Sequence, residues 1–176
     1  DVMVRAAKLL QDSPDIELNL FGSGQTKQAA IELAEQLQLN NIRFHHPVAK
    51  SRIPAILSGA DVVLMTLFQS PLIHIYFENK LIDYLGAGKP ILGAMDGLQS
   101  KLIEREGAGR TVPSLDYEGL ANLILWAAGQ PDELSMWGQR GHQFVRNNLD
   151  QGVILDRYCE VLERLEIPLN CPHGIR

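Results

Sequence analysis

The densest group of polar side chains lies in the run Glu78-Asn79-Lys80-Leu81-Ile82-Asp83, which we expect to open a helix. Asn79 is a residue type that caps helices, so the helix should begin at it. A helix N-terminus offers unpaired N–H groups and partial positive charge, and Lys80 adds a full charge, which suits a diphosphate. Asp83 lies one turn beyond Asn79, where its carboxylate could accept hydrogen bonds from ribose hydroxyls. The alternative is a solvated surface pair of Lys80 and Asp83.

Two further segments could contact the same ligand. His74 precedes the helix, and an imidazole there can hydrogen-bond a phosphate, although an exposed loop histidine without a function is the alternative. Gly22-Ser23-Gly24 follows an apolar run, and its glycines would let the backbone approach a phosphate or a sugar. The alternative for the glycines is a tight strand-to-helix turn, since the full dinucleotide fingerprint is absent.

Apolar runs with strand character alternate with segments of helical periodicity along the chain. This alternation predicts an α/β fold, a doubly wound parallel sheet with helices on both faces. Such sheets bind ligands beyond the carboxyl ends of their strands. Strands are expected at 16–21, 42–46, 61–67, 90–94 and 110–112, and helices at 1–11, 26–39, 51–59, 79–87, 98–106, 116–128, 132–148 and 152–165.

The last expected helix carries Tyr158, Val161 and Leu165 at helical spacing, which predicts a stripe facing the core. We expect one domain over residues 1–166, followed by a tail at 167–176 that has two prolines and no periodicity.

Composition excludes several classes of function. A net charge of −5 without a basic run argues against a nucleic-acid surface. No apolar stretch is long enough for a transmembrane segment. Cys159 and Cys171 lack a metal-type spacing, which favours reduced thiols. We expect a cytoplasmic location, with the full-length protein able to lie peripherally at the inner face of the membrane.

The run ENKLIDYLGAGKPILG resembles the signature of family 4 glycosyltransferases, which have the two-domain GT-B fold. It is most similar to the bacterial branch that builds cell-surface polysaccharides. The segments ELNLFGSG, IRFHHPV, SRIPAILSGADVVLMTL and IEREGAGRTVP agree in order with the same domain, and the likeness extends from residue 1 to about 166. The resemblance implies the C-terminal, nucleotide-sugar-binding domain, a Rossmann-like half of the GT-B fold.

The resemblance implies roles for particular residues at the donor site. The carboxylate of Asp83 would bind the ribose, and the backbone of Glu78, Asn79, Lys80 and Leu81 would cradle the diphosphate. The activity implied is transfer of a hexose from a nucleoside-diphosphate sugar to an acceptor hydroxyl. That sugar nucleotide is the donor substrate, and no further cofactor is expected.

The remaining implied contacts come from the turns that follow the first two strands. Pro47 and Val48 would line the base pocket through backbone groups, and Gly22 and Gly24 would approach the donor. No Asp-x-Asp motif occurs, which is consistent with a metal-independent site.

The chain departs from the family pattern in two ways. Many members carry two glutamates with seven residues between them; Asp83 matches the second, but Ile75 stands at the first, with Glu78 or His74 as substitutes. The domain's first strand and the N-terminal acceptor domain are expected to be missing from this stretch. We therefore expect no catalytic base here and no activity from these 176 residues alone.

Two alternatives belong to other classes. A sugar-nucleotide C2-epimerase shares the fold, but its serine- and glycine-rich donor loop is not seen here. A non-enzymatic flavodoxin-like binding module would suit the acidic composition. A receiver-type module would need a phosphoacceptor Asp after the third strand, where the sequence has Thr66-Leu67-Phe68.

Overall fold

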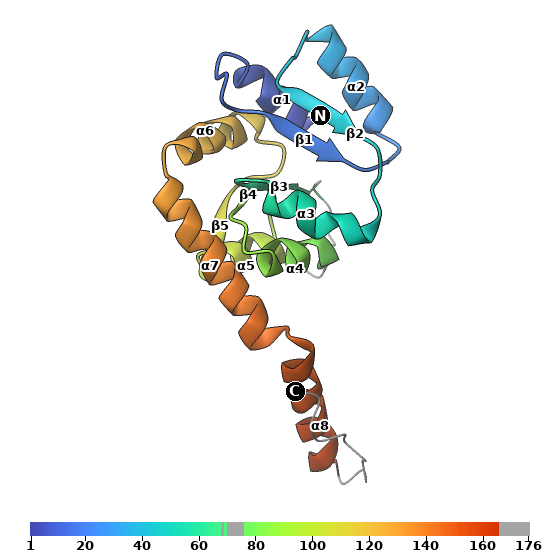
Figure 1. Ribbon diagram of the computed structural model, residues 1–176, viewed down its shortest axis with the longest axis vertical. Coiled ribbons are helices and arrows are strands. Elements are labelled where there is room, and N and C mark those ends of the chain that lie inside the picture. Colours follow the sequence, from blue (N-terminus) through green and yellow to red (C-terminus); the bar gives the residue numbers. More distant parts are fainter. Residues whose placement is uncertain (68, 70–75, 166–176) are drawn as a thin grey trace.

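The computed structural model describes residues 1–67, 69 and 76–165. Helices and strands alternate along most of this range, as the sequence predicts (Figure 1). The elements are α1 (Val2–Leu9), β1 (Leu18–Phe21), α2 (Lys27–Gln36), β2 (Ile42–His45), the 3-10 turn η1 (Lys50–Arg52), α3 (Ile53–Ser58), β3 (Val63–Thr66), α4 (Asn79–Gly86), β4 (Ile91–Ala94), α5 (Leu98–Arg105), β5 (Gly109–Val112), α6 (Tyr117–Ala128), α7 (Pro131–Asn148) and α8 (Gln151–Arg164).

All strand pairs are parallel, and they fall into two hydrogen-bonded groups. β1 pairs with β2, with Leu18 opposite Ile42. β3, β4 and β5 form the second sheet in that order, with Val63 opposite Ile91 and Ile91 opposite Gly109. Each crossover within a sheet is made by one helix, namely α2, α4 or α5. Crossovers of this kind are typical of parallel sheets.

Helices cover both faces of the β3-β4-β5 sheet, and its central strand β4 is buried along its whole length. Leu92 and Ala94 of β4 pack in one core cluster with α6, whereas Met65 of β3 and Ile91 of β4 pack in a second cluster with Leu85 of α4. Burial of each such large side chain contributes roughly 1.5–3 kcal/mol. The expected α/β fold class, with parallel strands between helical layers, is confirmed.

The first core cluster also joins the two sheets through helices. α1 lies against α6, and the buried Val4, Ala7 and Leu10 of the α1 segment share a cluster with Leu120 and Ala121 of α6. α6 in turn contacts β4 and β5. α1 and α6 are thus the bridge between β1-β2 and the larger sheet.

Two expectations for the C-terminal region are wrong. α8 leads away from the body of the molecule in Figure 1, and Tyr158, Val161 and Leu165 are 64%, 55% and 63% exposed, so their stripe does not face the core. Apolar periodicity shows an amphipathic helix but not what covers its apolar face. Cys159 is disulfide-bonded, so reduced thiols were the wrong expectation; cysteine pairing cannot be deduced from spacing alone. The tail at 167–176 lies outside the described residues.

Candidate functional site

The N-terminus of α4 is held by a side chain of the neighbouring helix. The buried Gln99 of α5 accepts a hydrogen bond from the Glu78 N–H through Oε1 (3.1 Å), and its Nε2 lies 3.5 Å from the Tyr76 carbonyl oxygen. Glu78 is the N-cap residue, with extended backbone, and makes no side-chain cap. The expectation that Asn79 caps the helix is therefore wrong by one residue. Glu78 is the cap and Asn79 is the first helical residue, because Gln99 fixes the backbone at Glu78.

The charged side chains at this end of α4 do not form the surface pair of Lys80 and Asp83 that was the alternative interpretation. Lys80 Nζ lies 2.7 Å from Glu78 Oε2, so the lysine pairs backward along the chain and not with Asp83. Asp83 is exposed, and within the described residues its carboxylate has no ion-pair or hydrogen-bond partner. Leu81 is fully buried in the core cluster under α4, so only its backbone is available to a ligand.

Replacing Gln99 with leucine should destabilise the protein by about 1–3 kcal/mol, because the partly buried Glu78 N–H would lose its acceptor. Urea unfolding measures this change. Gln139→Leu on α7 is the matched control, because the Gln139 side chain is exposed and makes only a 3.5 Å contact with Ser135 Oγ. Equal unfolding free energies for the two variants would contradict the role given to Gln99.

The glycine turn after β1 is tied to the end of β2 by a lysine. Lys27 Nζ donates to the Gly22 carbonyl at 2.8 Å and to the His45 carbonyl at 2.5 Å. Phe21 stacks on the His45 ring, with 4.3 Å between centroids. Gly22 has a φ of +138°, a backbone conformation that residues other than glycine rarely adopt. Gly24 does not have a positive φ. The turn is thus fixed by the hydrogen bond from Lys27 to the Gly22 carbonyl, and the space beside both glycines is open.

The other expected contacts lie at the end of β2 and before α4. Pro47 is exposed and Val48 half-buried, directly after β2 and next to the carbonyl of His45 that Lys27 engages. His74 lies outside the described residues. No hydrogen bond or ion pair in the described ranges joins the turns after β1 and β2 to the N-terminus of α4.

The loop after β4 was missed by the sequence reasoning, although it also follows a strand. Asp96 Oδ2 accepts from the Ser114 N–H at 3.1 Å, which links the ends of β4 and β5. Gly97 caps α5 with φ of +92°, which favours glycine. The signal was present, since the rule that ligands bind beyond strand ends applies equally to Asp96, Gly97 and Gln99.

Tyr84 of α4 carries a shifted pKa. Burial raises the pKa of its phenol above 10.0, and the negative charges of Glu78 and Asp83 act in the same direction. Below pH 10 both the folded and the unfolded chain keep this proton, so the contribution to stability is complete there. As the pH rises further, the unfolded chain ionises first and that stability is lost. The free energy of unfolding should therefore fall less steeply above pH 10 in Tyr84→Phe than in the unchanged chain, as urea titrations at several pH values would show; parallel curves would contradict this.

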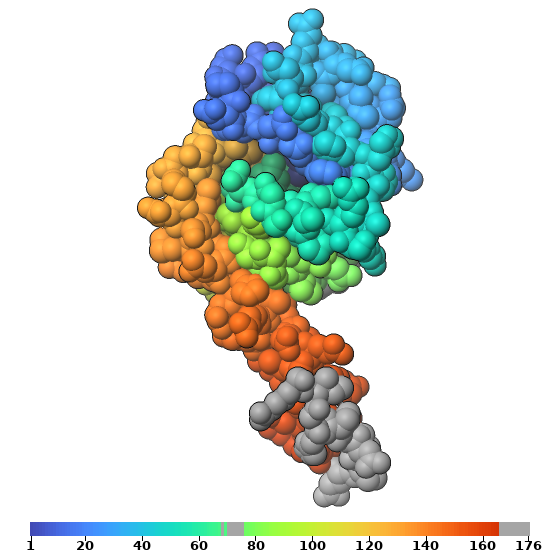
Figure 2. Space-filling model, in the orientation of Figure 1, coloured from blue at the N-terminus to red at the C-terminus, as the bar shows by residue number. Residues whose placement is uncertain are grey.

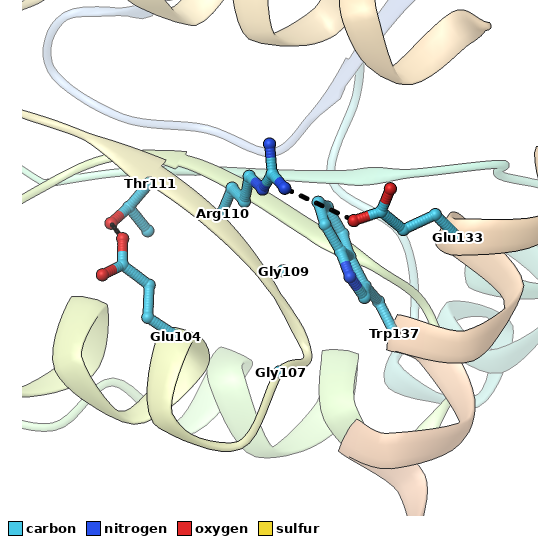
Figure 3. Close-up of a pocket in the computed structure, with 7 residues that line it drawn as sticks. All are labelled: Glu104, Gly107, Gly109, Arg110, Thr111, Glu133 and Trp137. Atoms are coloured by element: carbon cyan, nitrogen blue, oxygen red, sulfur yellow. Dashed lines mark hydrogen bonds and ion pairs between the residues drawn. The ribbon is translucent and has the colours of Figure 1, made fainter. Parts of the chain in front are cut away.

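A pocket of about 370 Å³ lies beside β5 and contains none of the expected donor residues (Figure 3). Its polar groups engage one another. Arg110 lies 3.4 Å from Glu133 and stacks over Trp137, and Thr111 Oγ1 donates to Glu104 Oε1 at 2.6 Å. These contacts link β5 to α5 and α7, and none of the residues expected at the donor site takes part in them.

The described ranges hold neither a metal-binding cluster nor a membrane-spanning helix. No group of three or more His, Cys, Asp or Glu side chains there could hold a metal ion. No described helix is both long and apolar enough to cross a bilayer.

Comparison with solved structures shows the fold. A glycosyltransferase from Rickettsia africae aligns with a TM-score of 0.78 at 18% identity, over 95% of this chain and 44% of its own. Sucrose-phosphate synthase from Thermosynechococcus elongatus gives 0.76 at 19% identity, over 94% and 42%. HepE from Anabaena, in complex with UDP-glucose, gives 0.74 at 20% identity, over 92% and 44%. The chain spans less than half of each of these proteins.

No curated protein matches the chain in sequence. A family model described as "Glycosyl transferases group 1" matches residues 1–129, which is most of the chain. The epimerase and flavodoxin-like alternatives are not favoured by this match. With a Rossmann-like GT-B fold and a match of this extent, the chain belongs to the group 1 glycosyltransferases.

Proposed function

We propose that this chain is the C-terminal donor-binding domain of a family 4 glycosyltransferase that transfers a hexose from a nucleoside-diphosphate sugar to an acceptor hydroxyl. The observation that carries the proposal is the N-terminus of α4. Its first N–H groups, at Asn79 and Lys80, have no acceptor within the helix, and the unpaired carboxylate of Asp83 lies one turn away. One short segment thus carries N–H groups that can donate hydrogen bonds to an anion and a carboxylate that can accept hydrogen bonds from hydroxyl groups.

Each group has a separate task in this proposal. The helix N-terminus and Lys80 stabilise the charge that builds on the leaving diphosphate. Asp83 accepts hydrogen bonds from the ribose hydroxyls, while the backbone after β1 and β2, at Gly22, Gly24, Pro47 and Val48, surrounds the sugar and the base. The charge is met by amides and a lysine, without a metal ion. His74 or Glu78 takes the place of the family's first glutamate.

Binding of a diphosphate by Lys80 would compete with the ion pair that Lys80 forms with Glu78. In the structure it pairs with Glu78 at 2.7 Å, with both side chains partly exposed. An exposed pair contributes only about 0–1 kcal/mol, so a diphosphate can displace Glu78 from Lys80 at small cost. Glu78 would then be free to contact the sugar hydroxyls.

The proposal extends to the whole protein. Solved structures of similar fold include TarM from S. aureus in complex with UDP and WaaG, a glycosyltransferase involved in lipopolysaccharide biosynthesis. These proteins support a role in bacterial cell-surface polysaccharide synthesis, with UDP as the first nucleotide to test. The acceptor domain is a separate N-terminal unit, and the 176 residues alone bind the donor without turnover. A cytoplasmic protein at the inner face of the membrane fits this role.

Calorimetric titration with UDP, UDP-glucose, GDP and GDP-mannose tests the proposal. We expect binding of one nucleotide class, and comparable binding of its sugar conjugate, because most contacts go to the ribose and diphosphate. Uridine and guanosine without phosphates should bind far more weakly. The proposal is contradicted if no nucleotide binds up to millimolar concentration, or if the free nucleoside binds as tightly as the diphosphate.

A further inference from the structure

The amide side chain of Gln99 contacts two peptide groups of the segment before α4. Its oxygen accepts from the Glu78 N–H at 3.1 Å, and its nitrogen lies 3.5 Å from the Tyr76 carbonyl oxygen. These two peptide groups lie on either side of Phe77. Gln99 is only 1% exposed, so water cannot replace a hydrogen bond that is lost there.

The other anchors of this segment are apolar. Phe77 packs against the core cluster that contains Leu81, which is itself fully buried. Apolar packing is not directional, whereas a hydrogen bond depends on the orientation of its donor and acceptor. In the described part of the chain, both of the hydrogen-bonding contacts that other elements make with residues 76–78 come from Gln99. The orientation of these peptide groups therefore depends on Gln99.

The start of α5, which carries Gln99, is itself held in place by β5. Asp96 lies just before the helix, and its Oδ2 accepts from the Ser114 N–H at 3.1 Å. Ser100 Oγ lies 2.6 Å from Thr111 Oγ1. These contacts lie on both sides of Gln99 in the sequence, so the residue projects from a fixed part of the fold.

The peptide that Gln99 holds comes directly before the amides that the proposed function assigns to the diphosphate. These are the N–H groups of Asn79 and Lys80, which have no acceptor within the helix. Figure 2 shows the α4 segment, in green, at the surface beside α3, in teal. Supporting residues must hold a binding group within about 0.5 Å of its productive position. A rotation of the Glu78 peptide would displace both amides.

We propose that Gln99 is a positioning residue of the donor site, which holds the Glu78 peptide so that the Asn79 and Lys80 amides point at the diphosphate. The inference rests on the proposed function. Because Gln99 is buried, it acts through the backbone of Glu78 and does not touch the ligand. It therefore governs affinity for the diphosphate and not for the nucleoside, whose contacts belong to Asp83 and to the turns after β1 and β2.

Gln99→Met removes both polar contacts and keeps a long, unbranched side chain in the core. We expect its affinity for the tighter-binding of UDP and GDP to fall about 10- to 100-fold, the usual cost of losing a group that orients a ligand-binding group. Affinity for the corresponding nucleoside should stay unchanged. Calorimetric titration measures the diphosphate, and amide chemical shifts at millimolar concentration measure the nucleoside. In the unliganded chain, the amide signals of Asn79 and Lys80 should also move.

Asn41→Leu is the matched control, because Asn41 is another buried amide side chain that is bonded to backbone. Its Nδ2 donates to the Ala7 carbonyl at 2.8 Å, a contact that joins the start of β2 to α1. The control should melt at a lower temperature than the unchanged chain, as Gln99→Met should. It should keep full nucleotide affinity and leave the amide signals of Asn79 and Lys80 in place.

Gln99→Glu gives a second test that does not depend on losing the contact. The carboxylate can still accept from the Glu78 N–H, and the adjacent helix N-termini favour its charged form. The added negative charge would repel the diphosphate, so affinity for it should fall while affinity for the nucleoside is kept. Raising the salt concentration should restore part of the loss, because salt screens like charges.

The outcomes separate this inference from the function on which it rests. If the unchanged chain binds a nucleotide and both Gln99 variants bind it equally well, Gln99 does not position the diphosphate and the proposed function stands. The inference is also overturned if Gln99→Met loses diphosphate and nucleoside affinity by the same factor. If the unchanged chain binds no nucleotide, the proposed function fails and this inference fails with it.

Discussion

Asp83→Asn should weaken nucleotide binding about 10- to 100-fold, because hydrogen bonds to a charged group contribute roughly 1.5–3 kcal/mol and the amide keeps only one acceptor oxygen. The side chain is exposed and has no partner within the described residues, so its removal should leave the fold intact. Calorimetric titration with the nucleotide that binds best measures the loss.

Asp156→Asn is the matched control for this experiment. It makes the same chemical change on the exposed surface of α8, which leads away from the body of the molecule that contains α4 (Figure 1). The control should bind nucleotide as the unchanged chain does, and both variants should melt at the same temperature. If Asp83→Asn keeps full affinity, the carboxylate does not hold the ribose.

Gly138→Ala should destabilise the protein by about 2–3 kcal/mol and lower Tm by roughly 5–10 °C. A Cβ atom at Gly138 of α7 would lie 2.1 Å from the Gly88 carbonyl oxygen, and this neighbour is backbone that cannot rotate away. The contact fixes the end of α4 against α7, where His142 Nδ1 also lies 2.7 Å from the Gly86 carbonyl oxygen. Overpacking there must move a helix.

Gly86→Ala is the control for Gly138→Ala. Gly86 ends α4, and a Cβ atom there would meet only Val145 Cγ1 at 4.0 Å. Alanine should be neutral or stabilising there, since it favours the helix by about 1 kcal/mol over glycine. Calorimetric melting of both variants decides the point, and similar losses of Tm would show that the α4–α7 contact is not close-packed.

Most helices and strands could be predicted because burial imposes a strong pattern of apolar residues on the sequence. The run from Asp61 to Leu67 is nearly all apolar, and the structure places β3 within it. The residues before α4 were harder. Local propensity favours Asn79 as the cap, but the cap is Glu78, whose N–H donates a hydrogen bond to Gln99 of another helix. A contact between residues of different helices leaves no local signal.

Other features depended on partners that a single sequence does not reveal. The stripe of Tyr158 and Leu165 has the spacing of a core face but is exposed on α8. Lys27 reads as an ordinary first-turn residue of α2, yet it joins the ends of β1 and β2. The division of the strands into two groups follows from pairing across the sheet, which alternation along the chain does not encode.

Amide chemical shifts during a titration with UDP test the central claim most directly. If the donor lies beyond the strand ends, the shifts that change should belong to residues 78–83, to the glycine turn at 22–24 and to Val48. Amides of Arg110 and Thr111, beside the pocket in Figure 3, should stay unchanged. Changes concentrated at Arg110 and Thr111, or spread evenly over the molecule, would contradict the assignment of the donor site to the N-terminus of α4.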